Sequence, residues 1–291
     1  MKRLLLIYNP VSGKGSFKNR IDYTIDALQK NDFLVTPYRL SANENVGELL
    51  EKLDISNFQG IIAAGGDGTL NAVVSGIIQK KIKIPLGIIP VGTSNDFANH
   101  LGIKRGLDKA LDKIIAGETK YIDVGTINNK TFINVVSVGN LTSIAHKTNV
   151  VVKNNLGKLA YYINVLGQYP IFKPFKLTIE VDGTQHHEDA LLFFVLNSPC
   201  AGGFKNLAPH AKVDDGKLDV LVIKNCNAFE KLSLFLKVIK GEHHSDDCAL
   251  YFQADKLLVE CEDVVETDMD GEKGPDFPLE ISCETQLKIY C

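Results

Sequence analysis

The sequence lacks the features that mark membrane-spanning, secreted and nucleic-acid-binding proteins. No stretch approaches the roughly 18 uninterrupted apolar residues that cross a bilayer. The apolar run after the basic start ends after five residues, at Asn9 and Pro10, and is too short for the core of a signal peptide. The formal net charge is -3, whereas nucleic-acid-binding domains usually carry a strong basic excess. We therefore expect a cytoplasmic protein with no nucleic-acid partner.

Cysteine pairs at the close spacing of zinc sites and redox centres are absent too. The six cysteines lie far apart in the sequence, at Cys200, Cys226, Cys248, Cys261, Cys283 and Cys291. We interpret them as reduced thiols of the core or the surface. Internal repeats and low-complexity linkers are also absent, so any domain boundary has to be placed from a change in the pattern of strands and helices.

That pattern changes near residue 120. Before it, apolar strand-like runs (3–8, 60–65, 84–90) alternate with helical spacings (17–28, 70–78, 107–115). After it come strands joined by turn residues, at 121–127, 131–138, 175–181, 190–197 and 217–223. The first rhythm is typical of βαβ units with a parallel sheet, and the second of a β-sandwich. Because 291 residues suffice for two domains, we predict an N-terminal α/β domain and a C-terminal, mainly antiparallel β-sandwich domain.

Charge and amphipathicity single out three later segments. From Val124 to Ile179 there is no Asp, Glu or Arg and there are six lysines, whereas Glu260 to Asp276 holds eight acids and one lysine. Taken alone, two unrelated solvated faces explain this contrast best. The apolar spacing over residues 229–239 predicts a helix, and we expect its apolar positions to face the core rather than a membrane.

Glycine-rich loops follow three strands of the first domain. They read YNPVSGKGS, GGDGTLN and PVGTSNDFA. Because the carboxyl ends of parallel strands meet at one edge of the sheet, these loops can bring backbone N–H groups and helix N-termini to phosphate oxygens. We therefore predict a nucleotide-binding domain. Neither a P-loop nor a G-x-G-x-x-G motif at a strand end is present, so neither a standard P-loop ATPase nor a dinucleotide dehydrogenase is indicated.

Five motifs in order resemble the diacylglycerol kinase catalytic family of soluble bacterial lipid kinases. They are NPVSGKG from Asn9, GGDGTLN from Gly65, PVGTSNDFA from Pro90, LAPHAKVDDGKLDV from Leu207 and DGE from Asp270. GGDGT alone is less specific, since NAD kinases and phosphofructokinases share close versions of it. The resemblance implies an ATP-binding α/β domain over 1–121, a lipid- and metal-binding β-sandwich over 122–275, and a last segment, about 276–291, that returns to the first domain.

The resemblance also implies which residues contact ATP: Asn9, Pro10, Val11, Ser12, Gly13, Gly66, Asp67, Gly68, Thr69, Leu70, Asn71, Ala72 and Thr93. Family members commonly place a further nucleotide-contacting threonine near the end of the second strand. This sequence has Leu40 or Ser41 there, so that contact is left unassigned.

Asp270 matches the position of the family's general base, although Asp270-Gly271 alone reads as a turn. The resemblance implies a Mg²⁺ ion held by Asp215 and by the main-chain carbonyls of Lys212 and Lys217, an oxygen-only set that suits this ion. Asp96 and Asp123 resemble acids linked to the ion through water. From the residues alone, the VDDG stretch around Asp215 also reads as a hairpin turn.

We predict an ATP- and Mg²⁺-dependent kinase that phosphorylates the hydroxyl of a diacylglycerol-like lipid. A kinase of a soluble substrate such as NAD, and a nucleotide-binding regulator without catalysis, are the alternatives. The acceptor, whether diacylglycerol, phosphatidylglycerol, a sphingoid base or an isoprenoid alcohol, stays open, as does a homodimer. We expect the enzyme to act peripherally at a membrane surface, with part of 124–179 and its residues Tyr161, Tyr162 and Tyr169 as the contact face.

Overall fold

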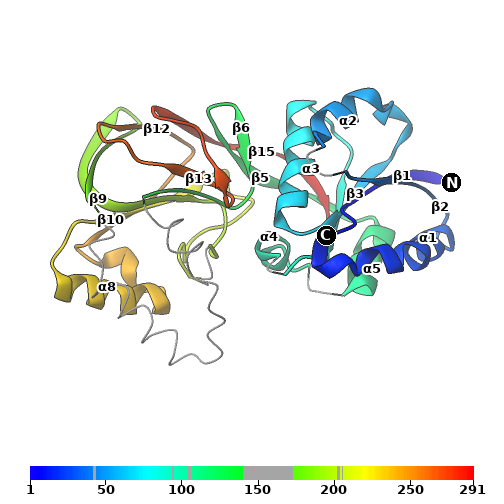
Figure 1. Cartoon of the computed structure of the whole chain (residues 1–291), viewed down its shortest axis with the longest axis horizontal. Coiled ribbons are helices and arrows are strands. Elements are labelled where there is room, and N and C mark those ends of the chain that lie inside the picture. The colour runs from blue at the N-terminus through cyan, green and yellow to red at the C-terminus, as the bar shows by residue number, and fades with distance from the viewer. Residues whose placement is uncertain (42–43, 94, 104–105, 140–172, 202–203, 205) are drawn as a thin grey trace.

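The computed structural model describes residues 1–291 except 42–43, 94, 104–105, 140–172, 202–203 and 205. Figure 1 shows an α/β domain and a β-sandwich side by side, joined by strands that run from one into the other. The predicted two-domain fold is confirmed. The predicted membrane contact at Tyr161, Tyr162 and Tyr169 lies outside the described residues.

A parallel sheet forms the centre of the N-terminal domain, in the order β2-β1-β3-β4, with β15 beside β4. Its strands are β1 (Lys2–Tyr8), β2 (Phe33–Arg39), β3 (Gly60–Gly65) and β4 (Leu86–Pro90). All residues of β3 and β4 are buried. Such continuous apolar runs are expected where helices cover both faces of a sheet.

Helices cover both faces of this sheet. They are α1 (Ile21–Gln29), α2 (Val46–Lys52), α3 (Asp67–Gln79), α4 (Asp96–His100) and α5 (Leu107–Ala116), with short 3-10 helices at Ser12–Gly15, Phe17–Arg20 and Ile55–Asn57. In Figure 1, α2 and α3 lie on one face, and α1 and α5 lie on the other. The predicted helix over 17–28 begins as a 3-10 turn and becomes α-helical at Ile21.

The C-terminal domain is built from antiparallel strands around its own apolar core. The strands are β5 (Thr119–Ile127), β6 (Lys130–Phe132), β7 (Val135–Val138), β8 (Phe175–Val181), β9 (Thr184–Leu196), β10 (Leu218–Lys224), β11 (Ala249–Ala254), β12 (Lys256–Cys261), β13 (Thr267–Met269), β14 (Glu272–Lys273) and β15 (Leu279–Tyr290). A 3-10 turn lies at His243–Ser245. The single strand predicted over 131–138 is two strands, and Ile133 and Asn134 between them carry N–H groups that donate to the carboxylate of Asp270.

Two long antiparallel strands, β5 and β15, connect the domains. The start of β15 pairs with β12 of the sandwich, and its end pairs in parallel with β4, Ile289 beside Leu86. β5 pairs with β15 over almost its whole length. Because β5 and β15 contribute buried residues to the cores of both domains, the exact domain limits near residue 121 stay a prediction.

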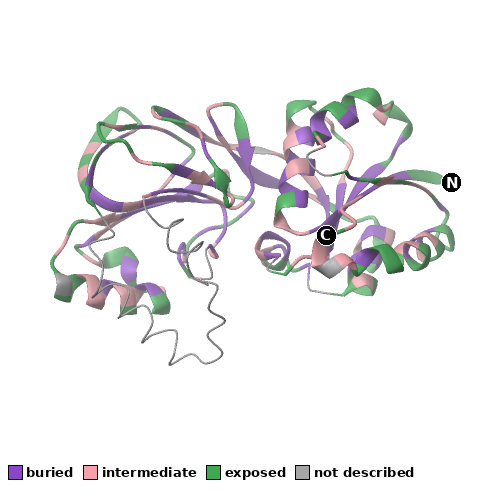
Figure 2. Ribbon diagram, in the orientation of Figure 1, coloured by how far each residue is buried: buried purple, intermediate pink, exposed green. Residues whose placement is uncertain are grey.

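Helix α8 (Ala228–Lys240) corrects one expectation from the sequence. Among the side chains of α8 whose burial is described, Leu234 and Val238 are the buried ones, and they join the core cluster of the sandwich. Phe229, Leu236 and Ile239, which we expected in the core, are 80%, 42% and 49% exposed. Positions 234 and 236 differ by about 200° around a helix axis, so the helix carries two apolar stripes and buries only one of them (Figure 2). Among the described helices, none is both long and apolar enough to cross a membrane.

Candidate active site

The three glycine-rich loops meet at the carboxyl edge of the parallel sheet, as the sequence predicted. The Asn9 N–H donates to the Ala64 carbonyl at 3.0 Å, which joins the end of β1 to β3. The Val91 N–H donates to the Gly65 carbonyl at 3.0 Å, which joins the end of β4 to β3. The predicted nucleotide residues therefore gather at one edge: Asn9–Gly13 after β1, Gly66–Ala72 at the start of α3 and Thr93 after β4.

Two of the glycines are required because the loops touch. A Cβ added to Gly13, whose φ is 58°, would stand 1.9 Å from the Val91 carbonyl oxygen. A Cβ added to Gly92 would stand 2.5 Å from the Gly66 Cα. No side chain fits at either distance, so glycine lets the loop backbones lie directly against one another.

Asn95 fastens the loop after β4 to the loop after β3. It is buried and adopts a left-handed conformation with φ 53°. Its side chain accepts from the Gly92 N–H at 2.9 Å and donates to the Gly92 carbonyl at 2.8 Å. Its own N–H donates to Oδ2 of Asp67 at 2.9 Å. Asp67 is thereby used in holding the loops together at the first turn of α3.

The start of α3 presents the groups that suit a phosphate. Gly66 precedes the helix and has no side chain to cap it, so the first-turn N–H groups and the positive end of the helix dipole face the loop edge. Thr69 accepts from Nδ2 of Asn9 at 3.1 Å, which links this turn to the loop after β1. The side chain of Leu70 is buried in the core, so a nucleotide contact at Leu70 would use its backbone.

The structure distinguishes Leu40 from Ser41, the two candidates for a nucleotide contact near the end of β2. Leu40 is buried in the N-terminal core, and its N–H donates to the Tyr8 carbonyl at 2.9 Å. Ser41 is exposed, and its N–H donates to Oε2 of Glu44 at 2.8 Å. Of these two residues, Ser41 is the one with a hydroxyl exposed to a ligand.

Asp270 occupies a cradle of backbone donors in the sandwich domain. It lies in the β13–β14 turn with φ 52°, and Gly271 follows with φ 90°. Its Oδ1 accepts from the N–H groups of Asn134 at 3.0 Å and Val135 at 2.8 Å, and its Oδ2 accepts from Ile133 at 2.7 Å. The Asp270 N–H donates to the Val135 carbonyl at 2.9 Å. Asp270 therefore serves both as a turn residue and as a precisely oriented carboxylate.

The environment of Asp270 also sets its acidity. Burial raises the pKa of this carboxyl to about 6, because an ionised group is poorly solvated there. The three N–H donors oppose that effect by stabilising the carboxylate. A carboxyl that ionises close to neutral pH suits a general base.

The predicted metal loop lies against Asp123 of β5. Asp123 is fully buried; its N–H donates to the Val213 carbonyl at 2.6 Å, and its Oδ2 accepts from the Gly216 N–H at 2.8 Å. Oδ1 of Asp215 accepts from the Lys217 N–H at 3.1 Å. The structure thus places Asp123 of β5 against the loop that contains Asp215 and Lys217, and Lys212 lies at the start of this loop.

Helix α4 of the N-terminal domain lies close to this loop. The pKa of Asp96 is raised by burial and by the nearby charge of Asp67. The pKa of His100 is lowered by burial and by Lys120, while Asp214 acts in the opposite direction. Nζ of Lys120 lies 3.9 Å from Oδ2 of Asp214. The charges of Lys120 and Asp214 therefore act on His100 of α4, so this helix lies within electrostatic range of the predicted metal loop.

Asn197 connects Asp123, beside the predicted metal loop, with the backbone segment that holds Asp270, and the sequence analysis missed it. It is fully buried at the end of β9, and its Nδ2 donates to the Asp123 carbonyl at 2.9 Å and the Ile133 carbonyl at 3.1 Å. Its N–H donates to the Asn134 carbonyl at 2.9 Å. The available signal was the polar pair Asn197-Ser198 directly after the apolar run ALLFFVL.

Replacing Asn197 by alanine should destabilise the sandwich domain. The change leaves two buried carbonyls without this donor, and each such loss costs about 1 to 3 kcal/mol. We expect the free energy of unfolding, measured with urea, to fall by about 2 to 6 kcal/mol. Asn225→Ala is the control, because Asn225 makes its side-chain hydrogen bond to Asp189 on the exposed surface. Equal effects of the two changes would contradict the role given to Asn197.

Comparison with known proteins identifies the family of this two-domain arrangement. Residues 3–127 match the family described as diacylglycerol kinase catalytic domain, and residues 134–290 match the YegS C-terminal NAD kinase beta sandwich-like domain. A diacylglycerol kinase of Bacillus subtilis (strain 168) is 34% identical over 281 residues, covering 96% of this chain and 93% of the relative. The chain belongs to the diacylglycerol kinase family. Its membership makes it a kinase and implies ATP as the phosphoryl donor.

Other relatives agree with this assignment. A diacylglycerol kinase of Staphylococcus aureus (strain bovine RF122 / ET3-1) is 36% identical over 293 residues and covers 99% of this chain and 92% of its own. The crystal structure of a diacylglycerol kinase from Bacillus anthracis str. Sterne superposes with a TM-score of 0.80 at 26% identity, covering 99% of this chain and 96% of that one. The family resemblance stated from the motifs is confirmed, and the individual site residues stay predictions.

Proposed function

We propose that this kinase transfers the γ-phosphoryl group of ATP to the free hydroxyl of a diacylglycerol-like lipid and releases a phosphatidate-like product. The observation that carries the proposal is the oriented, half-buried Asp270 carboxylate next to the nucleotide domain. β6 packs beside α3 and leads directly into the Ile133–Val135 cradle of Asp270. The helix that starts at the predicted phosphate site and the base are therefore joined through one strand.

Asp270 takes the proton of the attacking hydroxyl in this proposal. Oδ1 accepts two backbone N–H groups, and Oδ2 accepts one. A carboxylate oxygen can accept two hydrogen bonds, so Oδ2 can also accept from an alcohol. As the hydroxyl oxygen attacks the γ-phosphorus, its proton moves to Oδ2, and the bond from the γ-phosphorus to ADP breaks. The glycine loops hold the phosphates with backbone N–H groups.

The residues of the metal loop fit a Mg²⁺ ion. The loop offers the Asp215 carboxylate and the carbonyls of Lys212 and Lys217, and the buried carboxylate of Asp123 lies against it. These are the oxygen donors that Mg²⁺ prefers. A Mg²⁺ ion held there would neutralise negative charge beside the predicted nucleotide site. In its absence, Asp123, Asp215 and Asp96 would repel a polyanionic nucleotide.

Asp215→Ala should lower both the activity and the stabilisation by Mg²⁺. We expect at least a tenfold loss of kcat/KM and a melting temperature that no longer rises when Mg²⁺ is added. Asp214→Ala is the matched control, because Asp214 is the adjacent acid and its recorded ion pair is with Lys120. A fully active Asp215→Ala enzyme whose melting temperature still responds to Mg²⁺ would remove the metal site from the proposal.

The exposed stripe of α8 is the described surface best suited to a bilayer. Phe229, Leu236 and Ile239 present apolar side chains to the outside, and Lys231 and Lys240 lie on the same helix. The apolar side chains can insert between the lipids. Anionic head groups also attract the lysines, and each lysine near the surface contributes about 1 kcal/mol to the binding free energy. We propose that this stripe holds the kinase at the surface that contains its substrate.

Changing Phe229, Leu236 and Ile239 together to serine should abolish binding to vesicles of phosphatidylglycerol and phosphatidylcholine. Co-sedimentation should show at least a tenfold weaker association, while the affinity for ATP in solution stays unchanged. Binding of the unaltered protein should also weaken as salt rises, because salt screens the lysines. Val264→Ser is the control, since Val264 is an exposed apolar residue in the acidic segment. Vesicle binding that survives the triple change would place the membrane contact elsewhere.

A further inference from the structure

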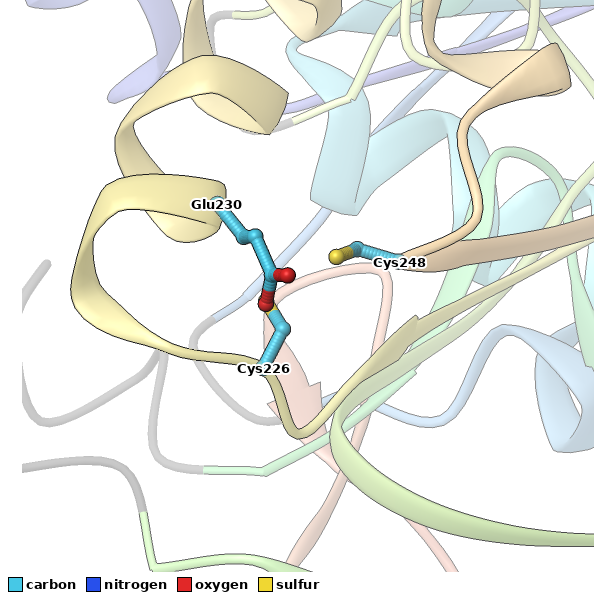
Figure 3. Close-up of side chains that lie close together, drawn as sticks. All are labelled: Cys226, Glu230 and Cys248. Atoms are coloured by element: carbon cyan, nitrogen blue, oxygen red, sulfur yellow. The ribbon is translucent and has the colours of Figure 1, made fainter.

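Two cysteines and a glutamate that are distant in the sequence converge at one end of α8 (Figure 3). Cys226 follows β10, Glu230 lies in the first turn of α8, and Cys248 directly precedes β11. One ligand atom of each residue, the two Sγ atoms and a carboxylate oxygen, lies within 4.8 Å of the other two. This cluster is separate from the nucleotide loops, the Asp270 cradle and the Asp215 loop.

The backbone around the cluster is held in place by hydrogen bonds. The Lys224 N–H donates to the Cys248 carbonyl at 2.9 Å, which closes the β10–β11 pair beside both cysteines. The Asn227 N–H donates to Oε2 of Glu230 at 2.9 Å, and Oδ1 of Asn227 accepts from the Glu230 N–H at 3.0 Å. This capping box fixes the carboxylate of Glu230 by one oxygen and leaves the other oxygen for the thiols or a cation.

The chemistry of these three groups matches a thiophilic divalent cation. Without a cation, burial and the neighbouring Cys226 raise the pKa of the Cys248 thiol to about 12. A bound Zn²⁺ would replace both thiol protons, forming two Zn–S bonds and one Zn–O bond. In a tetrahedral site with Zn–S bonds of about 2.3 Å, the sulfurs stand about 3.8 Å apart. The three ligand atoms lie within 4.8 Å of one another, so the side chains need to approach by no more than about 1 Å to reach that geometry.

A cavity beside the cluster provides room for a fourth ligand. It has a volume of about 220 Å³ and is lined by residues that include Glu230, Ser233, Ser245 and Cys248. Asp246, also in its lining, is already paired with Lys237 at 2.6 Å. A water molecule in this cavity would complete the tetrahedron. Mg²⁺ prefers oxygen donors and is not expected to compete for a site with two sulfurs.

We propose that Cys226, Glu230 and Cys248 form a Zn²⁺ site that fastens the N-terminus of α8 to the β10–β11 edge of the sandwich. Binding converts two neutral thiols and one carboxylate into three anionic ligands and releases two protons per metal ion. The site sets the position of the exposed stripe of α8 and takes no part in phosphoryl transfer. It stands independently of the substrate assigned to the kinase.

The test is titration of the full-length, reduced, metal-free protein with Co²⁺ and then with Zn²⁺. One equivalent of Co²⁺ should give a thiolate-to-metal charge-transfer band and the visible bands of tetrahedral Co²⁺, and Zn²⁺ should bleach them. Zn²⁺ should also raise the melting temperature. Cys226→Ser should abolish the thiolate bands and this rise, and Glu230→Gln should weaken the metal affinity at least tenfold.

Cys261→Ser provides the matched control, because Cys261 is a partly buried cysteine of β12 outside the cluster. It should keep the bands, the one-to-one stoichiometry and the rise in melting temperature. Cys248 is buried, so Cys248→Ser could unfold the protein. Cys226 is only half-buried, so Cys226→Ser is the variant used to test the site. Absence of thiolate bands in the unaltered protein, or bands that persist in Cys226→Ser, would overturn the proposal. Isolation of a disulfide between Cys226 and Cys248 in protein that does not bind Co²⁺ after reduction would also overturn it.

Discussion

Asp270→Asn is expected to lower kcat by about 10²- to 10⁴-fold, the range that general-base catalysis supplies. An amide has the shape of the carboxylate but cannot take up the proton of the acceptor hydroxyl. The affinity for ATP should change little, because the nucleotide loops belong to the other domain. Single-turnover transfer of labelled phosphate measures the chemical step, and ATP binding is measured separately by calorimetry.

Glu266→Gln is the control for this experiment. Glu266 is an exposed acid four positions before Asp270 and outside the DGE motif, and its neutralisation should leave kcat within a factor of two or so of the unaltered enzyme. The melting temperature of Asp270→Asn shows whether the cradle of Ile133–Val135 N–H groups still holds the turn. A folded Asp270→Asn enzyme with near-normal kcat would show that another group takes the proton.

The raised pKa of Asp270 also fixes the direction of the pH dependence. The carboxyl keeps its proton in the folded enzyme up to a pH of about 6, and only the ionised form acts as a base. Below that pH, kcat/KM should fall about tenfold for each pH unit. The residual activity of Asp270→Asn should lack this acid limb, whereas Glu266→Gln should retain it.

Gly13→Ala is expected to damage the nucleotide site most strongly among the glycine changes. The new Cβ would stand 1.9 Å from the Val91 carbonyl oxygen at a φ of 58°, so the loops after β1 and β4 must separate. We expect the free energy of unfolding to fall by about 2 to 5 kcal/mol. The affinity for ATP, measured by calorimetry, should weaken at least tenfold.

Gly102→Ala is the control that separates left-handed backbone strain from the steric clash between the loops. Gly102 has a φ of 71°, and a Cβ there meets no heavy atom within 4 Å among the described residues. This change should cost only the left-handed strain, about 1 to 2 kcal/mol, and should leave the affinity for ATP unchanged. If both alanine variants bound ATP equally well, contact between the two loops would not be what shapes the nucleotide site.

The sequence predicted best the features that are formed by residues adjacent in the chain. The buried run GIIAAG is bounded by glycines, and it forms β3 over residues 60–65 as predicted. The glycine loops were recognisable because each directly follows such a run and precedes a helix. Their shared place at one sheet edge follows from parallel topology alone. The two-domain architecture likewise follows from the change of rhythm near residue 120.

The rest of the site depends on contacts between distant parts of the chain. The donors that orient Asp270 come from Ile133, Asn134 and Val135, more than 130 positions earlier. Asn197 reaches Asp123 and Ile133 through its side chain, and no local pattern specifies those partners. The sequence separation of Cys226 and Cys248 gives no sign that they are close, because they meet only through the pairing of β10 with β11 on either side of α8.

Helix α8 shows a different limit of sequence reasoning. Two apolar stripes lie on opposite sides of this helix, and helical periodicity identifies both equally well. Which stripe is buried depends on the fit of Leu234 and Val238 to Phe194 and Leu221 of the sandwich. Tertiary packing therefore overrides the simple expectation that the longest apolar stripe faces the core.

The most direct test of the central proposal is transfer of labelled phosphate from ATP to a panel of acceptors in the presence of Mg²⁺. The panel contains diacylglycerol, phosphatidylglycerol, a sphingoid base and an isoprenoid alcohol in mixed vesicles, together with NAD and a sugar phosphate in solution. We predict a labelled phosphatidate-like product from diacylglycerol, lost in Asp270→Asn, and no product from the soluble acceptors. Labelling of NAD or the sugar phosphate but of no lipid, or ATP binding without any product, would contradict the proposed function.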